Sequence, residues 1–194
     1  MSRRSYWAWG LESDEPDEQE RAKTAARLSE RWGVAMEPPR IARAEELSLR
    51  KARLEPPGPL AGICATTTYD RAAHTYGKSY RDLVRAIRGD FANPPDVVAY
   101  PRDEAGVVAL LEWCDAAGAA AVPYGGGSSV VGGVEPPLGD RPVVSIDLSR
   151  LDQVLEVDAT SRAARIQAGV LGPALDARLK PHGFTLRHFP QSFE

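Results

Sequence analysis

The sequence predicts an α+β fold in which a helical N-terminal arm precedes an α/β domain. A strand–helix–strand pattern over residues 96–122 leads directly into a glycine-rich loop. Residues 151–170 have the character of a β-hairpin, with apolar and polar residues alternating in its second half. Residues 1–60 differ from the rest in being acidic and helical, so we expect the arm at 1–60 and the domain at 61–194.

The arm is expected to hold two helices. Residues 12–20 include six acidic residues in nine positions, which indicate a solvated arm or a helix start. Apolar spacings of three and four predict a helix over 21–32, with a glycine after it. A second helix is expected at 45–54, before the turn or linker Pro-Pro-Gly-Pro at 56–59. Three tryptophans are expected to dock the arm onto another domain rather than to contact a cofactor: Trp7, Trp9 and Trp32.

The domain is expected to start with a helix at residues 80–88, where apolar residues form a stripe. Residues 96–100 are a short apolar run typical of a strand. Asp103 stands at an N-cap position, and a helix over 104–117 follows that ends before a glycine. A second strand at 119–122 runs into the glycine loop.

Beyond the glycine loop, the sequence predicts a strand at 143–148, where apolar and polar residues partly alternate. A hairpin is expected from residues 151–157 and 162–170. Gly172 and Pro173 then begin a short helix, and a glycine terminates it near residue 183.

Composition excludes several classes of protein. Hydrophobic residues make up 43% and charged residues 26%, a globular balance, and the formal net charge of −3 argues against a nucleic-acid binder. No stretch approaches the roughly 18–20 apolar residues of a membrane span, and the N-terminus lacks the apolar core of a secretory signal. Cys64 and Cys114 lack companions at metal spacing, so we expect reduced thiols in a cytoplasmic protein.

Residues 122–134 are the most informative segment, with the sequence Val-Pro-Tyr-Gly-Gly-Gly-Ser-Ser-Val-Val-Gly-Gly-Val. Three successive glycines let backbone N–H groups approach a ligand closely and converge on an anion such as phosphate. The lysine of a Walker A loop is missing, and so is the last glycine of the G-x-G-x-x-G fingerprint. We therefore expect a loop that binds diphosphate without a helix behind it; a glycine-rich surface turn is the alternative.

Two motifs connect this loop to a known family. Residues 94–101 followed by a helix and then 122–129 resemble the FAD-binding domain of the vanillyl-alcohol oxidase / p-cresol methylhydroxylase (PCMH-type) flavoproteins. The stretches 74–82 and 189–194 are similar to the branch of FAD-linked oxidases that includes alkyldihydroxyacetonephosphate synthase. The resemblance extends from about residue 32 to the end of the chain.

The resemblance implies a small βαβ-like subdomain beside a mixed sheet, with FAD between them. It places the following residues against the cofactor: Pro123, Tyr124, Gly125, Gly126, Gly127, Ser128, Ser129, Val130, Pro190, Gln191 and Ser192. Some members tether FAD to a histidine in this loop. The position here is Gly127, which has no nucleophile, so the resemblance implies non-covalent FAD.

The family's activity implies an FAD-dependent oxidoreductase acting on a small molecule, such as a hydroxy acid or an acyl-dihydroxyacetone phosphate. The sequence assigns no catalytic residue and no metal site: His74, His182 and His188 are not at ligand spacing with a carboxylate. A lone histidine is usually a surface residue or a satisfied core residue, and we expect this of all three; the functional alternative for His74 is a place near the flavin or at a domain contact. A D-lactate/glycolate-type dehydrogenase fragment, a non-catalytic nucleotide- or partner-binding remnant and, more weakly, an ATP-dependent transferase remain alternatives.

The resemblance also implies a longer protein. In the family, a further FAD segment, a substrate cap and a catalytic element follow the stretch that 189–194 resembles. We therefore expect the chain to be the N-terminal part of a larger flavoenzyme, with a small independent protein as the alternative. A homodimer, or contact with a C-terminal catalytic portion, is the expected assembly.

Overall fold

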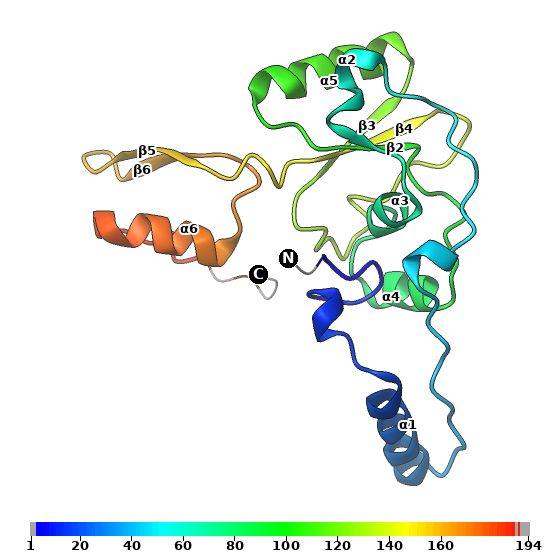
Figure 1. The fold of residues 1–194 in the computed structure, drawn as a ribbon. Helices are drawn as coiled ribbons and strands as arrows, with labels where there is room; N and C mark the ends of the chain where they lie inside the picture. Colours follow the sequence, from blue (N-terminus) through cyan, green and yellow to red (C-terminus); the bar gives the residue numbers. More distant parts are fainter. Residues whose placement is uncertain (1–2, 189, 191–194) are drawn as a thin grey trace.

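Four strands form the central sheet of this computed structural model, which describes residues 3–188 and 190 (Figure 1). The strands are β1 (Cys64–Ala65), β2 (Val97–Ala99), β3 (Ala120–Tyr124) and β4 (Val143–Asp147), and they lie in the order β1–β2–β4–β3. β2, β4 and β3 run parallel, whereas β1 is antiparallel to β2. The carboxyl ends of the three parallel strands therefore meet at one edge of the sheet, which is where open α/β sheets bind ligands.

Helices cover both faces of this sheet. α5 (Glu104–Ala116) lies across one face and α3 (Thr68–Ala73) lies on the other (Figure 1). All five residues of β4 are buried, because the strand lies between β2 and β3 and beneath both helical layers. Apolar and polar residues partly alternate along β4, but the polar ones do not face solvent: Ser145 and Asp147 are also buried. The expected α+β class is confirmed.

The strand–helix–strand unit follows its sequence signals. The carboxylate of Asp103 accepts a hydrogen bond from the backbone N–H of Gly106 at 2.8 Å and so caps α5. Gly118, just after the helix, adopts a φ of +60°, the left-handed conformation that ends many helices. β2 lies within its predicted range, and β3 continues beyond its predicted end to Tyr124.

The N-terminal segment packs onto the same chain. Tyr6 and Trp7 are buried in one cluster with Tyr76 and Phe91, against α3 and α4 (Tyr80–Ile87). The ring centroids of Tyr6 and Phe91 lie 5.8 Å apart, and those of Tyr76 and Phe91 lie 5.5 Å apart. Burial of these aromatic rings fastens the segment to the α3–α4 side of the molecule. The division of the chain at residue 60 stays a prediction.

α1 (Glu18–Trp32) projects away from the rest of the molecule (Figure 1). The carboxylate of Asp17 caps it by accepting from the backbone N–H of Glu20 at 2.8 Å, and Gly33 ends it with a φ of +65°. A 3-10 helix (η1, Glu12–Asp14) precedes it in the acidic stretch. Trp32 is 57% exposed, so this tryptophan does not dock the arm onto the described part of the chain.

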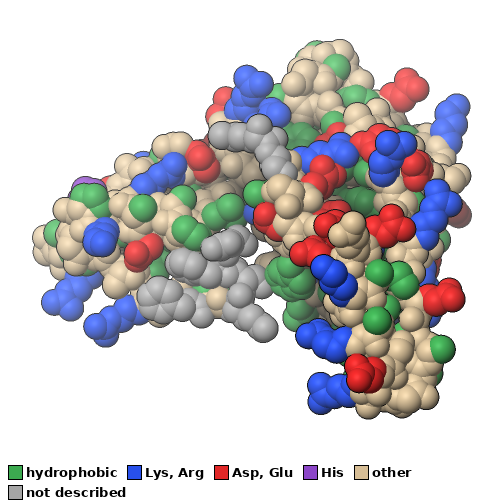
Figure 2. Space-filling model, turned by 60° about the horizontal axis from the view of Figure 1, so that its bottom comes forward, with side chains coloured by type: hydrophobic (Ala, Val, Ile, Leu, Met, Phe, Trp, Pro, Cys, Tyr) green, Lys and Arg blue, Asp and Glu red, His purple; other side chains and the backbone are tan. Residues whose placement is uncertain are grey.

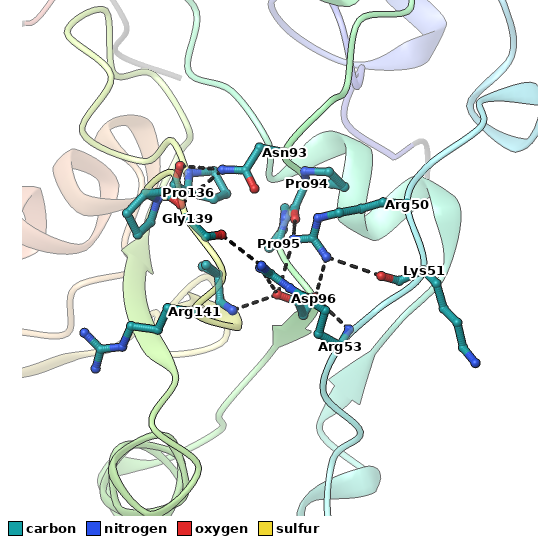
Figure 3. Close-up of polar contacts among 12 residues, drawn as sticks. Arg50, Lys51, Arg53, Asn93, Pro94, Pro95, Asp96, Pro136, Gly139 and Arg141 are labelled. Atoms are coloured by element: carbon teal, nitrogen blue, oxygen red, sulfur yellow. Dashed lines mark hydrogen bonds and ion pairs between the residues drawn. The ribbon is translucent and has the colours of Figure 1, made fainter.

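The helix expected at 45–54 is wrong. Only the 3-10 helix η2 (Ala44–Glu46) forms, and residues 47–57 then contain neither helix nor strand. Arg50 and Arg53 both pair with the fully buried carboxylate of Asp96, which also accepts from the backbone N–H of Val143 (Figure 3). These contacts across the fold outweigh the helical pattern of the segment. The short helix α2 (Gly58–Ala61) starts inside the expected Pro-Pro-Gly-Pro turn.

The predicted hairpin and helix near the C-terminus are confirmed. β5 (Val154–Asp158) and β6 (Ala163–Ile166) pair antiparallel, and α6 (Gly172–Leu179) lies beside them. The 3-10 helix η3 (Lys180–His182) follows, and Gly183 ends it with a φ of +77°. The unit extends sideways from the main sheet, and its strand residues are mostly exposed (Figure 1).

The surface carries both signs of charge. Figure 2 shows basic and acidic side chains interspersed over the face drawn there. None of the helices in the described residues combines the length and the apolar character that a bilayer crossing requires. The same residues hold no group of three or more His, Cys, Asp or Glu side chains placed to bind a metal ion, and Cys64 and Cys114 are free thiols.

Candidate functional site

A cavity of about 420 Å³ opens at the carboxyl edge of the parallel strands. Gly125, Gly126 and Ser128 of the glycine loop form one part of its wall. Three other regions form most of the remaining wall: the strand ends at Tyr100, Tyr124 and Asp147, residues 69–78 around α3, and the N-terminal segment between Arg4 and Asp14. Ser149 and Leu171 also line the cavity. The volume falls within the range of about 300–1,000 Å³ that is usual for small-molecule sites.

The glycine loop offers unused backbone donors to this cavity. Within the described residues, none of the backbone N–H groups of 125–130 donates a hydrogen bond to a protein acceptor. Gly127 has a φ of +69°, and a Cβ added there would overlap the hydroxyl oxygen of Tyr124. That hydroxyl in turn donates to the carbonyl oxygen of Ala73 at 3.0 Å. The loop is thus fixed against α3 by a glycine that cannot carry a side chain, while its amides stay available.

The segment after α3 also approaches the loop through backbone contacts. The backbone N–H of Lys78 donates to the carbonyl oxygen of Ser129 at 2.7 Å. A Cβ at Gly77 would overlap that same carbonyl oxygen, so glycine is required for the close approach. The hydroxyl oxygen of Ser129 accepts from the backbone N–H of Gly133 at 2.9 Å, within the loop itself. The motif around residues 74–82 therefore serves to position the glycine loop.

His74 and Asp147 form a buried polar pair at the base of the cavity. His74 Nε2 lies 2.9 Å from Asp147 Oδ2, and its Nδ1 lies 2.7 Å from the carbonyl oxygen of Asp70. Burial opposes ionisation of Asp147, but hydrogen bonds from His74 and Ser149 outweigh it and hold the pKa of this carboxyl below its ordinary value. The imidazole also packs on Tyr124, with ring centroids 4.2 Å apart.

Tyr100, like Tyr124, places a phenol near the His74–Asp147 pair. Burial, and a 2.6 Å hydrogen bond from its hydroxyl to the carboxylate of Asp70, raise the pKa of Tyr100 far above its ordinary value. Burial likewise raises the pKa of Tyr124. Both phenols therefore stay protonated and act as hydrogen-bond donors rather than as bases. Neither Tyr100 nor Tyr124 therefore offers a phenolate to the site.

The structure brings only some of the predicted cofactor-binding residues to the cavity. Tyr124, Gly125, Gly126 and Ser128 line it. The others lie elsewhere: Gly127 and Ser129 support the loop, Pro123, Val130 and Pro190 are exposed, and Gln191 and Ser192 fall outside the described residues.

Sequence reasoning missed the contribution of the N-terminal segment. Arg4 and Trp9 line the cavity, as does Lys78. The tryptophans are expected from the sequence to dock the arm rather than to contact a cofactor, whereas Trp9 is 44% exposed and lines this cavity. A basic pair and clustered tryptophans were visible in the sequence, but nothing local ties them to a loop more than a hundred residues away.

Comparison with known proteins gives the same family for the region that holds this site. The family model described as "FAD binding domain" matches residues 95–194, more than half of the chain. The alkyldihydroxyacetonephosphate synthase of Dictyostelium discoideum is 41% identical over 124 residues, which are 64% of this chain and 20% of that protein. The mitochondrial D-lactate dehydrogenase [cytochrome] of Arabidopsis thaliana is 30% identical over 118 residues, 61% of this chain and 19% of that protein.

A solved structure agrees with these sequence matches. An alkyldihydroxyacetonephosphate synthase superposes with a TM-score of 0.74 and 34% identity, covering 79% of this chain and 31% of that one. The chain spans about a fifth of the length of the curated relatives that it matches. Because the match includes β2, α5, β3 and the glycine loop between β3 and β4, the chain belongs to the FAD-binding domain family of FAD-linked oxidases.

Proposed function

We propose that the glycine loop at residues 123–129 binds the diphosphate of FAD, and that this chain is the cofactor-binding portion of a flavin-dependent oxidoreductase. One observation carries the proposal. The unused backbone N–H groups of 125–130 stand beside a cavity at the carboxyl edge of a parallel sheet. Free amides in a concave loop are strong partners for a diphosphate and need no helix dipole behind them.

The residues present fit this cofactor. Gly125 and Gly126 line the cavity with backbone alone, and Ser128 adds a hydroxyl donor. A Cβ at Gly125 would meet no atom within 4 Å, so the loop leaves open space where a ligand would lie. FAD supplies the redox chemistry when bound, and this chain supplies recognition, orientation and shelter from water. Binding is non-covalent in this proposal, because Gly127 offers no nucleophile.

The substrate class is proposed from the relatives of this chain, because the described site does not identify it. One relative's name specifies the synthesis of an alkyl dihydroxyacetone phosphate, and we propose a substrate of that phosphate-ester class. We assign no catalytic base among the described residues. We also propose that Gln191 and Ser192 lie beside the flavin, that residues 1–60 act as an arm to the domain at 61–194, and that the protein works in the cytoplasm as a homodimer or joined to a C-terminal catalytic portion.

A titration of the purified chain with FAD tests the proposal, with quenching of flavin fluorescence as the signal. The variant Gly126→Glu is expected to abolish binding, because a carboxylate in the loop repels and displaces the diphosphate. The fold should accept the change, since a Cβ there meets only a guanidinium nitrogen of Arg4, at 3.7 Å. Gly62→Glu is the matched control, because a Cβ at this exposed position meets nothing within 4 Å. Equal binding by wild type and Gly126→Glu would contradict the loop assignment.

A 2-hydroxy-acid dehydrogenase is the second candidate. The match to a D-lactate dehydrogenase over a similar part of the chain favours it. Both candidates share the FAD-binding site, so the titration does not separate them. Anaerobic loss of the flavin's visible absorbance on adding D-lactate to the reconstituted protein would favour the dehydrogenase.

A further inference from the structure

Arg4 and Lys78 are two cationic side chains at the cavity that have no acidic partner. Within the described residues, neither forms an ion pair. Each is only partly exposed, and each lines the cavity beside the glycine loop. Partly buried charges are normally paired, so two unpaired cations at one cavity call for an anionic ligand.

Arg4 contacts the loop through its side chain and Lys78 contacts it through its backbone, and both contacts leave the charged group available. The guanidinium of Arg4 donates one hydrogen bond, to the carbonyl oxygen of Gly126 at 2.6 Å. The remaining guanidinium nitrogens of Arg4 have no acceptor among the described residues. The carbonyl oxygen of Arg4 accepts from the hydroxyl of Tyr69 at 2.8 Å, which fixes the backbone at this point. A planar guanidinium held in this way is suited to binding phosphate oxygens.

Lys78 contacts the loop through its backbone, and its ammonium lies near the N-terminal segment. Its backbone N–H binds the carbonyl oxygen of Ser129, and its ammonium reaches the carbonyl oxygen of Ser5 at 3.4 Å. Burial, followed by repulsion from Arg4, lowers the pKa of the Lys78 ammonium to about 8, and the carboxylates of Asp82 and Glu15 offset this only in part. The protein thus holds a second positive charge where it is unfavourable without a counter-ion.

The carboxylates that face the cavity are already engaged. Asp147 accepts hydrogen bonds from His74 and from the backbone N–H of Ser149. Asp14 accepts from the backbone N–H of Leu11 at 3.3 Å. Neither carboxylate forms an ion pair with Arg4 or Lys78 among the described residues, so both cations remain available to an anionic ligand.

We propose that Arg4 and Lys78 form a cation pair that binds the diphosphate held by the glycine loop, so that the N-terminal segment, residues 3–14, is part of the cofactor site. This inference rests on the proposed function and adds two binding residues to it. Backbone amides recognise the diphosphate by hydrogen bonding, and the cation pair neutralises its charge. A ligand therefore fastens the N-terminal segment to the sheet edge by bridging Arg4 and Lys78.

FAD titrations of the full chain test the pair, with Arg4→Met and Lys78→Met as charge-removing variants. Each is expected to weaken FAD binding about tenfold, the usual scale for a hydrogen bond to a charged group. The charge-preserving variants Arg4→Lys and Lys78→Arg should recover most of the affinity. Arg81→Met is the matched control, because Arg81 is an exposed cation on nearby α4 that does not line the cavity. ADP, which carries the diphosphate without the flavin, should displace FAD and should lose affinity in parallel.

The outcomes separate this inference from the proposed function. Wild-type affinity in both methionine variants, with binding lost in Gly126→Glu, would overturn the cation pair and leave the loop assignment standing. Equal loss in the methionine and charge-preserving variants, together with lowered melting temperatures, would show a structural role and also overturn the pair. Absence of FAD binding by the wild-type chain would overturn the proposed function and this inference with it.

Discussion

At the scale of single residues, two glycines determine how the loop is built. Gly127 adopts a left-handed conformation against the hydroxyl of Tyr124, and Gly77 allows the backbone after α3 to approach Ser129. The three consecutive glycines predict close ligand approach; Gly125 and Gly126 line the cavity, and the approach of a ligand to them stays a prediction. The sequence did not distinguish Gly127, which packs against the hydroxyl of Tyr124, because that hydroxyl is held by a hydrogen bond to Ala73 of α3, 51 positions away.

Gly127→Ala is expected to destabilise the fold. The left-handed backbone costs about 1–2 kcal/mol for a residue with a Cβ. Overlap with the Tyr124 hydroxyl adds a further cost of about 1–3 kcal/mol, typical of overpacking. Urea denaturation should show the combined loss as a lower midpoint. Gly125→Ala is the control, because its Cβ would meet nothing within 4 Å and no positive φ is required there. A midpoint unchanged in Gly127→Ala would contradict the packing role.

At the scale of elements, the predictions that succeeded depend on local signals. α1, α4 and α5 each begin after a side chain that accepts from the backbone of the first turn: Asp17, Ser79 and Asp103. The strands β2, β3 and β4 are short apolar runs that need no distant partner to be recognised. The helix expected at 45–54 failed because its arginines bind Asp96, some 43 to 46 positions away. Local pattern carries no information about such a partner.

Asp96 is expected to hold residues 47–57 and the sheet together. It is fully buried, and two arginines together with two backbone N–H groups donate to its carboxylate. Asp96→Ala should cost on the order of 3–5 kcal/mol, the range for breaking a buried ion pair from one side. Glu156→Gln is the control, since Glu156 and Arg165 are exposed and 3.9 Å apart, and should change stability by less than about 1 kcal/mol.

The same carboxylate predicts the direction of acid sensitivity. Burial opposes its ionisation, but hydrogen bonds from Arg53 and Arg50 prevail and lower the pKa of Asp96 well below its ordinary value. Its contribution to stability is therefore complete above the unfolded pKa of about 3.9 and is lost as the pH falls toward the folded value. An Asp96→Ala variant whose denaturation midpoint matched that of wild type at pH 7 would contradict this account.

At the scale of the whole molecule, the cavity is lined by residues from distant parts of the chain, and the sequence alone did not show that they come together. Arg4 contacts Gly126 across 122 positions, and Lys78 contacts Ser129 across the space between α3 and the loop. The resemblance to a flavoprotein family located the loop, but the family pattern begins near residue 32 and omits the N-terminal segment. Burial of Tyr6 and Trp7 against α3 and α4, together with the hydrogen bond from Tyr69 to the carbonyl oxygen of Arg4, holds Arg4 beside the loop. A site formed by residues that lie far apart in the chain becomes visible only when the fold is known.

This assembly predicts opposite effects of pH on FAD binding and on stability. Lys78 has a pKa of about 8 in the folded chain against 10.5 as its ordinary value. Protonated Lys78 therefore destabilises the fold below pH 8, and this effect is relieved as the pH rises from 8 to 10.5. FAD affinity should instead fall, by about tenfold, as the ammonium deprotonates. Arg4 from the N-terminal segment, Glu15 beyond it and Asp82 on α4 are the charges that tune Lys78.

Titrations with FAD and thermal melts between pH 7 and 9, carried out on the same samples, measure how FAD affinity and stability each change with pH. Lys78→Met is expected to flatten both, because it removes the group that titrates while leaving Arg4 and the loop amides in place. Arg81→Met should keep both slopes, since this exposed cation lies outside the cavity. If affinity fell with pH as steeply in Lys78→Met as in wild type, the titrating cation would lie elsewhere, and the link between the N-terminal segment and the diphosphate would rest on Arg4 alone.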